Sequence, residues 1–166
     1  MIVTVTPNPS TDRTVTLSAA LTRGAVHRVS SVSSEPGGKG VNVARALTLA
    51  GLDAIAVLPA APADPFLTLL TSAGVPAAPV PVRGAVRTNL AITEPDGTTT
   101  KLNEPGARLD GAELDALSAA VLDCAAAAGG PRAQELMIRA LLDPSEQVRI
   151  AAVNGLHTRP PKDREN

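Results

Sequence analysis

The residues best suited to chemistry lie between Gly37 and Asn42, where three glycines surround Lys39 just ahead of an apolar, helix-forming segment. Glycine lets a backbone turn tightly and bring its N–H groups close to a ligand. A helix that begins directly afterwards points the positive end of its dipole at the same place, and Lys39 adds a full positive charge. The stretch therefore predicts a site for an anion, or for a hydroxyl-rich ligand that carries one.

This glycine stretch is not a Walker A loop. Gly40 follows the lysine, and no glycine occupies the upstream position that the Walker A motif requires. A plain glycine-rich turn between a strand and a helix, with Lys39 solvated, is the alternative interpretation, because lone glycine motifs are weak signals.

Asp12 is a second candidate, because it follows an apolar, strand-like segment at residues 2–6. Two prolines after that segment end the strand, and open α/β sheets bind their ligands beyond the carboxyl ends of strands. A turn-forming role for Asp12 is the alternative that spacing alone favours.

The composition limits the class of protein. A length of 166 residues predicts one domain, and a net charge of −1 gives no reason to expect a nucleic acid or a membrane as partner. Cys124 is the only cysteine, and no signal peptide or membrane span is evident, so we expect a reducing, cytoplasmic location. Phe66 is the only aromatic residue, which predicts a core of small aliphatic side chains and modest stability.

Alternating strand and helix signals predict an α/β fold with a parallel sheet. Asp110 and Glu113 form a capping box, and Pro95-Asp96-Gly97 predicts a hairpin turn between two threonine-rich strands. The expected strands of the parallel sheet lie at residues 2–6, 54–58 and 77–82, and helices are expected at 41–50 and from Asp64 and Asp110.

Three motifs together carry a resemblance. They are Thr6-Pro7-Asn8-Pro9 followed by Asp12, Gly37-Gly38-Lys39-Gly40 followed by Asn42, and Arg87-Thr88-Asn89 ahead of the hairpin. In this order and spacing the chain resembles the ribokinase-like (PfkB-type) carbohydrate kinases, and within them 1-phosphofructokinase and tagatose-6-phosphate kinase. The resemblance implies a doubly wound sheet with a small β-lid over residues 1–127, and lids in this family often pair to form a homodimer. It places the lid strands at residues 13–17, 26–32, 88–93 and 98–103.

The resemblance also implies a reaction and a site. The family transfers the γ-phosphoryl group of ATP to a sugar hydroxyl with Mg²⁺, and 1-phosphofructokinase converts fructose 1-phosphate to fructose 1,6-bisphosphate. Asp12 would hydrogen-bond the sugar hydroxyls of a phosphorylated ketose, two glycines would lie against the sugar, and three polar residues would surround the phosphate. In some relatives a lid lysine reaches the site of the other subunit, whereas Ala25 and Val26 occupy that region here and leave Arg28 as the one candidate donor. The implied site residues are Asp12, Gly37, Gly38, Lys39, Asn42 and Arg87.

The chain departs from the family after about Gly130. The Gly-Ser-Leu-Pro-Pro-Gly loop and the Gly-Ala-Gly-Asp motif, whose aspartate is the family's general base, do not occur in the sequence. We therefore assign no catalytic residue and no metal ligand, and expect this chain alone not to phosphorylate a sugar at a useful rate.

In place of those motifs, residues 131–156 predict a helical tail, with a helix start at Asp143-Pro144-Ser145-Glu146. The tail resembles the second-helix region of a HEAT repeat, although one repeat cannot bury its own face. Residues 157–166 are expected to be disordered. Two alternatives to a kinase stay open: a non-catalytic module that binds a sugar phosphate or dimerises through the lid, and a HEAT-like interaction protein that acts through the tail.

Overall fold

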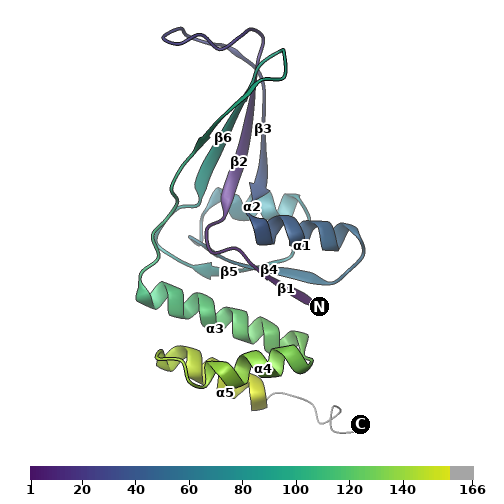
Figure 1. Ribbon diagram of the computed structural model, residues 1–166, viewed down its shortest axis with the longest axis vertical. Coiled ribbons are helices and arrows are strands. Elements are labelled where there is room, and N and C mark those ends of the chain that lie inside the picture. The colour runs from purple at the N-terminus through teal and green to yellow at the C-terminus, as the bar shows by residue number, and fades with distance from the viewer. Residues whose placement is uncertain (158–166) are drawn as a thin grey trace.

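The computed structural model describes residues 1–157 and shows an α/β fold from which a second sheet projects (Figure 1). A three-stranded parallel sheet in the order β1-β4-β5 forms the middle layer. Its strands are Ile2–Val5 (β1), Ala54–Ala60 (β4) and Ala77–Pro81 (β5). Helices Lys39–Leu49 (α1) and Pro65–Ser72 (α2) cover one face of this sheet, and helix Gly111–Ala128 (α3) covers the other (Figure 1).

The core of this part follows the alternation of β4. Ala56 and Leu58 pack with Phe66 of α2, and all three side chains are fully buried. Val57, between them in sequence, points to the opposite face and packs with Leu117 of α3. Continuous burial of the strand on both faces explains its unbroken apolar sequence.

Strand β4 is two residues longer than the predicted strand at 54–58 and includes Pro59. The N–H of Ala56 donates to the carbonyl of Pro76, on the side of β4 that faces β5. Backbone nitrogens alternate between the two sides of a strand, so the nitrogen of Pro59 faces the β1 side. Strand β1 has already ended at Val5, so the missing donor breaks no bond of the ladder. Strand β5 lies at an edge of the sheet, where its two prolines are tolerated.

The second sheet, called the lid sheet here, has four strands in the order β3-β2-β6-β7. Its strands are Val29–Gly37 (β3), Ser10–Leu17 (β2), Arg87–Thr93 (β6) and Thr99–Asn103 (β7). Strands β2 and β6 are parallel, whereas the two outer pairs are antiparallel. The predicted turn between β6 and β7 is confirmed, with Gly97 at φ 89°.

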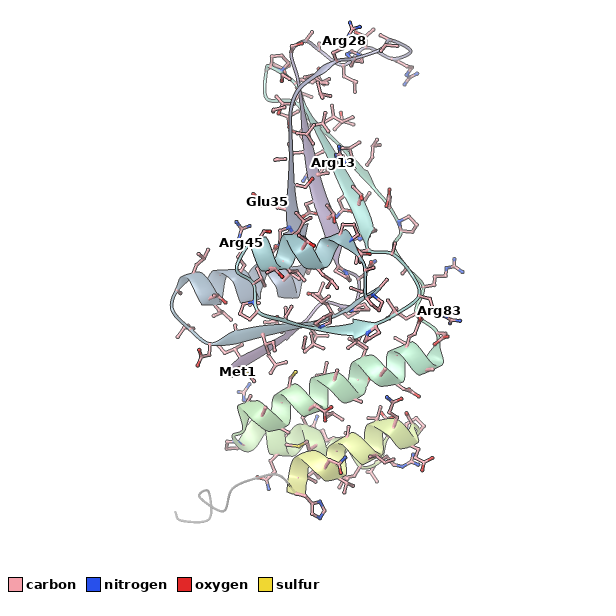
Figure 2. The ribbon with its side chains drawn as sticks, turned by 180° about the vertical axis from the view of Figure 1, so that it is seen from behind. Met1, Arg13, Arg28, Glu35, Arg45 and Arg83 are labelled. Carbon is pink, nitrogen blue, oxygen red and sulfur yellow. The ribbon has the colours of Figure 1, made fainter. Side chains whose placement is uncertain are left out.

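The bounds of two lid strands were predicted wrongly. Strand β2 begins at Ser10 instead of residue 13, and β3 covers Val29–Gly37 instead of 26–32. The reason is that the antiparallel ladder continues to the pair Ser10 and Gly37, so the first glycine of the glycine stretch belongs to a strand. Arg28 lies at the far end of the projecting lid sheet (Figure 2).

Two predicted helix starts are confirmed by their caps. The carboxylate of Asp64 accepts a hydrogen bond from the N–H of Phe66, and the Asp110–Glu113 capping box is complete.

None of the helices in residues 1–157 combines the length and apolar character that crossing a bilayer requires.

The predicted helical tail forms two helices, Pro131–Ala140 (α4) and Glu146–His157 (α5), which pack against α3 (Figure 1). Met137 is fully buried in the cluster they form with Leu122 and Ala152. The predicted start at Asp143 was wrong: its carboxylate accepts from the N–H of Ser145, and α5 begins after this turn. His157, expected to be disordered, is the last residue of α5, and the remaining residues of that prediction lie outside the described part.

Candidate functional site

One face of the lid sheet is polar and hollowed. Alternation along the strands places two rows of side chains on it, Asp12 beside Asn89 beside Asn103, and Thr14 beside Ala91 beside Lys101. These six residues define what we call the polar face, and they line a hollow of about 360 Å³. Asp12, predicted from its position after the first strand, is therefore placed in a concave site.

Asp12 is held in one orientation by its neighbours. Its Oδ1 accepts hydrogen bonds from Ser10 Oγ at 2.8 Å and from Asn89 Nδ2 at 3.0 Å. No partner is assigned to Oδ2 among the described residues, and this atom lies over Gly37, where a Cβ would overlap the carboxylate. An ionised carboxylate only accepts hydrogen bonds, so Oδ2 is suited to a hydroxyl donor of a ligand.

The next two glycines fit α1 against the end of β1. Gly38 is the N-cap at φ 119°, and a Cβ there would overlap Thr6. A Cβ on Gly40 would meet the carbonyl of Val5, and Thr6 Oγ1 accepts the N–H of Val41 at 3.0 Å. Close backbone approach, not only turn formation, therefore explains why glycine occupies these positions.

Lys39 and Asn42 lie on the exposed side of the first turn of α1. The N-cap residue Gly38 provides no side-chain cap, although Thr6 Oγ1 accepts one N–H of the first turn, that of Val41. The positive end of the helix dipole lies at the same place and favours an anion. Within residues 1–157, no hydrogen bond or ion pair joins either side chain to Asp12 or Arg87. The structure thus brings Asp12 and Gly37 into contact. Lys39 and Asn42 are close to Gly37 in the sequence but make no hydrogen bond or ion pair with Asp12 or Arg87.

Arg87 is on the same face of β6 as Asn89, opposite Ser10. Its Nη1 donates to the carbonyl of Glu104 at 3.0 Å, whereas its Nε is buried without a partner. The Oδ1 of Asn89 is also buried without a partner. Unsatisfied buried polar groups are uncommon in folded proteins, so two on neighbouring positions mark this end of the polar face as unusual.

Of the six residues of the polar face, only Asp12 was a predicted site residue. The five that the sequence prediction missed are Thr14, Asn89, Ala91, Lys101 and Asn103. Alternation in the hairpin was a usable signal, because it places Lys101 and Asn103 on one face. The parallel pairing of β2 with β6, which aligns Asn89 with Asp12, had no local signal.

No group of three or more His, Cys, Asp or Glu side chains is placed to hold a metal ion in the part of the chain that the structure describes. We therefore assign none of the described residues to Mg²⁺ or to ATP.

Residues 6–128 match the family model described as pfkB family carbohydrate kinase. The chain belongs to this family. The match begins just after β1, covers the lid sheet, β4, β5 and helices α1 to α3, and ends before α4. The family membership expected from the three motifs is therefore confirmed.

Individual relatives of this pfkB family chain agree with the match. The 1-phosphofructokinase of Xanthomonas campestris is 40% identical over 119 residues, which are 70% of this chain and 37% of that protein. The tetrameric inhibited form of phosphofructokinase-2 from Escherichia coli superposes with a TM-score of 0.67 at 33% identity, covering 74% of this chain and 41% of that one. The same enzyme in complex with fructose-6-phosphate gives a TM-score of 0.62 at 25% identity, covering 95% of this chain and 70% of that one. The chain spans about two fifths of the length of the curated relatives it matches.

Proposed function

We propose that this chain is the sugar-binding part of a 1-phosphofructokinase-like kinase and that its ligand is a phosphorylated ketose, fructose 1-phosphate. The observation that carries the proposal is the carboxylate of Asp12, fixed through Oδ1 and open at Oδ2 beside Gly37, in a hollow of about 360 Å³. The relative from Xanthomonas campestris and the phosphofructokinase-2 complex with fructose-6-phosphate support a ligand of this class.

Each proposed residue has a chemical role. Asp12 accepts hydrogen bonds from the sugar hydroxyls, and the missing side chains of Gly37 and Gly38 let the sugar approach the backbone. Lys39 and Arg87 contribute positive charge to the phosphate, Lys39 as a point charge and Arg87 as a forked donor. Asn42 contributes a neutral amide to the group of polar side chains around the phosphate. The proposed substrate-binding residues are Asp12, Gly37, Gly38, Lys39, Asn42 and Arg87.

Binding without turnover is the expected behaviour of this chain on its own. The family's Gly-Ala-Gly-Asp motif is absent from the sequence, so we assign no general base. ATP and Mg²⁺ belong to the family reaction, and no residue of this chain is assigned to them. A solvated site of this kind is expected to bind at roughly millimolar affinity, near −4 kcal/mol, more weakly at high salt. The single free thiol, Cys124, fits a reducing cytoplasmic setting.

Calorimetry with fructose 1-phosphate and with fructose tests the proposal. Asp12→Ala should weaken both ligands by about tenfold, because it removes a charged hydrogen-bond acceptor worth about 1.5–3 kcal/mol. Arg87→Ala should weaken fructose 1-phosphate much more than fructose, because it removes a phosphate contact. Arg108→Ala, an exposed arginine outside the hollow, is the matched control and should leave both affinities unchanged. Equal losses for both ligands with Arg87→Ala would contradict the phosphate assignment, and no binding by the wild type would contradict the function.

A second function, dimerisation through the lid sheet, is favoured by the face opposite the polar face. This face, called the apolar face here, carries Val15, Val32, Leu90, Ile92 and Leu102, and the polar residues Arg13, Ser34 and Thr88 share it. Leu102 is 56% exposed and Val32 is 45% exposed, so the strands at both edges of the lid sheet, β7 and β3, expose an apolar side chain on this face. A homodimer that pairs two such faces would bury them.

A further inference from the structure

Strand β1 forms one edge of the three-stranded sheet, and the side of its backbone that faces away from β4 is open (Figure 1). The N–H groups of Ile2 and Thr6 donate to carbonyls on the β4 side at 2.7 and 2.9 Å. Backbone groups alternate between the two sides of a strand, so the N–H groups of Val3 and Val5 point away from β4. No strand within residues 1–157 lies on that side of β1. An edge of this kind is a template for pairing with another strand.

The other edges of the two described sheets carry residues that oppose such pairing. Strand β5 contains Pro79 and Pro81, and a proline offers no N–H to a neighbouring strand. At the edges of the lid sheet, Pro36 lies in β3 and Lys101 lies in β7. Proline and lysine are residues with which proteins commonly protect exposed strand edges. Strand β1 has the sequence Ile-Val-Thr-Val, which includes neither residue and no charge.

The helix layers determine what kind of strand fits beside β1. Helix α1 packs over one face of β1, where Thr4 Oγ1 donates to the carbonyl of Gly40 at 2.9 Å, and α3 packs against Val3 on the other face. Ile2 and Val5 alternate to these two faces and are 43% and 39% exposed, so apolar surface is open on both faces at this edge. A strand added here would adjoin both helix layers, as β4 does, and would need apolar side chains on both of its faces.

We propose that the open edge of β1 binds a strand of another polypeptide, continuously apolar and parallel to β1, which extends the three-stranded sheet. Residues 158–166 do not have the sequence of such a strand, because they include Pro160 and Pro161 and are otherwise mostly charged. A second copy of β1 fits less well. Two copies related by a twofold axis would pair antiparallel, whereas both strand pairs of this sheet are parallel. The inference does not depend on the binding of a sugar by the polar face.

Hydrogen exchange of the full chain, followed by backbone amide NMR, tests this inference with the synthetic peptide Lys-Lys-Val-Ile-Val-Ile-Val-Lys-Lys as the probe. Its central run has the apolar, β-branched side chains that the edge requires. Saturating peptide should slow the exchange of the N–H groups of Val3 and Val5 by at least about tenfold, because each gains a backbone hydrogen bond. Ile2 and Thr6 already donate to the β4 side, so their exchange should change less. Unchanged exchange at Val3 and Val5 at the highest soluble peptide concentration would overturn the inference.

A nitroxide label on the amino end of the peptide tests the direction of pairing. In a parallel arrangement the label should broaden the amide signal of Ile2 more than that of Thr6. The reverse order would overturn the parallel arrangement.

Val3→Pro removes one N–H from the open edge without removing a donor to β4. This variant should weaken the peptide by about fivefold to tenfold, as expected for the loss of one backbone hydrogen bond. Val26→Pro is the matched control, because Val26 is 97% exposed in the connection before β3, and it should leave the affinity unchanged. A lower mass of the chain in Val3→Pro, measured by light scattering without peptide, would assign this edge to a second copy and overturn the proposed partner.

A peptide that is N-methylated along its apolar run keeps the experiment decisive if Val3→Pro does not fold. It retains the side chains and loses the backbone donors, so it should slow exchange at neither Val3 nor Val5. Equal binding of the methylated and unmethylated peptides would show an apolar contact without strand pairing and would overturn the inference.

Discussion

At the scale of single residues, the orientation of Asp12 is set before any ligand arrives. Ser10 Oγ and Asn89 Nδ2 both donate to one carboxylate oxygen, so the side chain does not have to be ordered on binding. Gly37 leaves the space that the other oxygen occupies. The site therefore depends on Gly37, although this residue has no side chain that could contact a ligand.

Gly37→Ala should separate ligand binding from stability. The added methyl group would overlap the Asp12 carboxylate, which would have to rotate away, so affinity for fructose 1-phosphate should fall by at least about tenfold, or 1.4 kcal/mol. The displaced group is the end of a side chain, so the free energy of unfolding should fall by only about 1 kcal/mol. Gly111→Ala, at a position with open space and no positive φ, is the control. Calorimetry and urea denaturation would show unchanged affinity for this control, and unchanged affinity for Gly37→Ala would contradict the role given to the glycine.

At the scale of elements, α3 packs against two parts of the molecule, the parallel sheet on one side and the helices α4 and α5 on the other. Leu117 packs against the sheet, and Leu122 packs against α4 and α5. An isolated pair of amphipathic helices cannot cover its own apolar face, and here α3 covers that of α4 and α5. Glu113 links the start of α3 to the segment that follows β5. Its carboxylate accepts hydrogen bonds from the N–H of Arg83 at 2.9 Å and from the N–H of Asp110 at 3.0 Å.

These bonds give Glu113 a predictable effect on acid stability. The hydrogen bond from the backbone of Arg83, followed by that from Asp110, lowers the pKa of Glu113 below its ordinary value. Because the folded pKa is the lower one, the unfolded chain binds more protons, and stability is lost as the pH falls from the ordinary glutamate pKa of about 4.3 through the folded one. Between about pH 5 and pH 3, the free energy of unfolding of Glu113→Gln should therefore decrease less than that of the wild type. Urea denaturation at stepped pH values measures this change.

Glu146→Gln is the matched control for that measurement. Glu146 is exposed at the start of α5, and its carboxylate has no hydrogen bond assigned to it in residues 1–157. This variant should follow the pH dependence of the wild type. An equally steep loss of stability in Glu113→Gln and the wild type would show that the two backbone bonds do not matter for acid unfolding.

At the scale of the whole molecule, the lid sheet stands away from the three buried clusters (Figure 1). Its two faces have opposite character, the polar face with the hollow and the apolar face with Leu102 and Val32. A sheet that is covered on neither face is an unusual arrangement for a stable monomer. Self-association is the simplest way to cover the apolar face while the polar face stays open to a ligand.

Light scattering after size-exclusion chromatography tests this association. The wild type should have the mass of a dimer at high protein concentration, and Leu102→Asp should shift it to the monomer, because a buried unpaired carboxylate is costly. Leu49→Asp is the control, because Leu49 is 80% exposed near the end of α1, away from the lid sheet. A wild type that stays monomeric at every concentration would rule out the proposed lid dimer.

The sequence alone was enough to predict the features of this protein that depend on local interactions. The capping box joins residues three positions apart, and the turn before Thr98 is set by Pro95, Asp96 and Gly97. The glycine stretch was predicted as a site because its backbone freedom and its lysine adjoin a helix start. The parallel sheet followed from the order of strand and helix signals, and the three motifs indicated the family to which the chain belongs.

Only the tertiary structure decided how the candidate site is composed. Asp12 and Asn89 are 77 positions apart, and their contact exists because β2 and β6 pair in parallel with one particular register. The same register places Lys101 across the hollow from Asp12, and the ladder between Ser10 and Gly37 draws the glycine stretch into a strand. Strand pairing exchanges backbone hydrogen bonds that every residue type offers alike, so the side chains carry little information about which strands meet. A shift of one residue would turn Asp12 to the opposite face, which is why the site could not be assembled before the register was known.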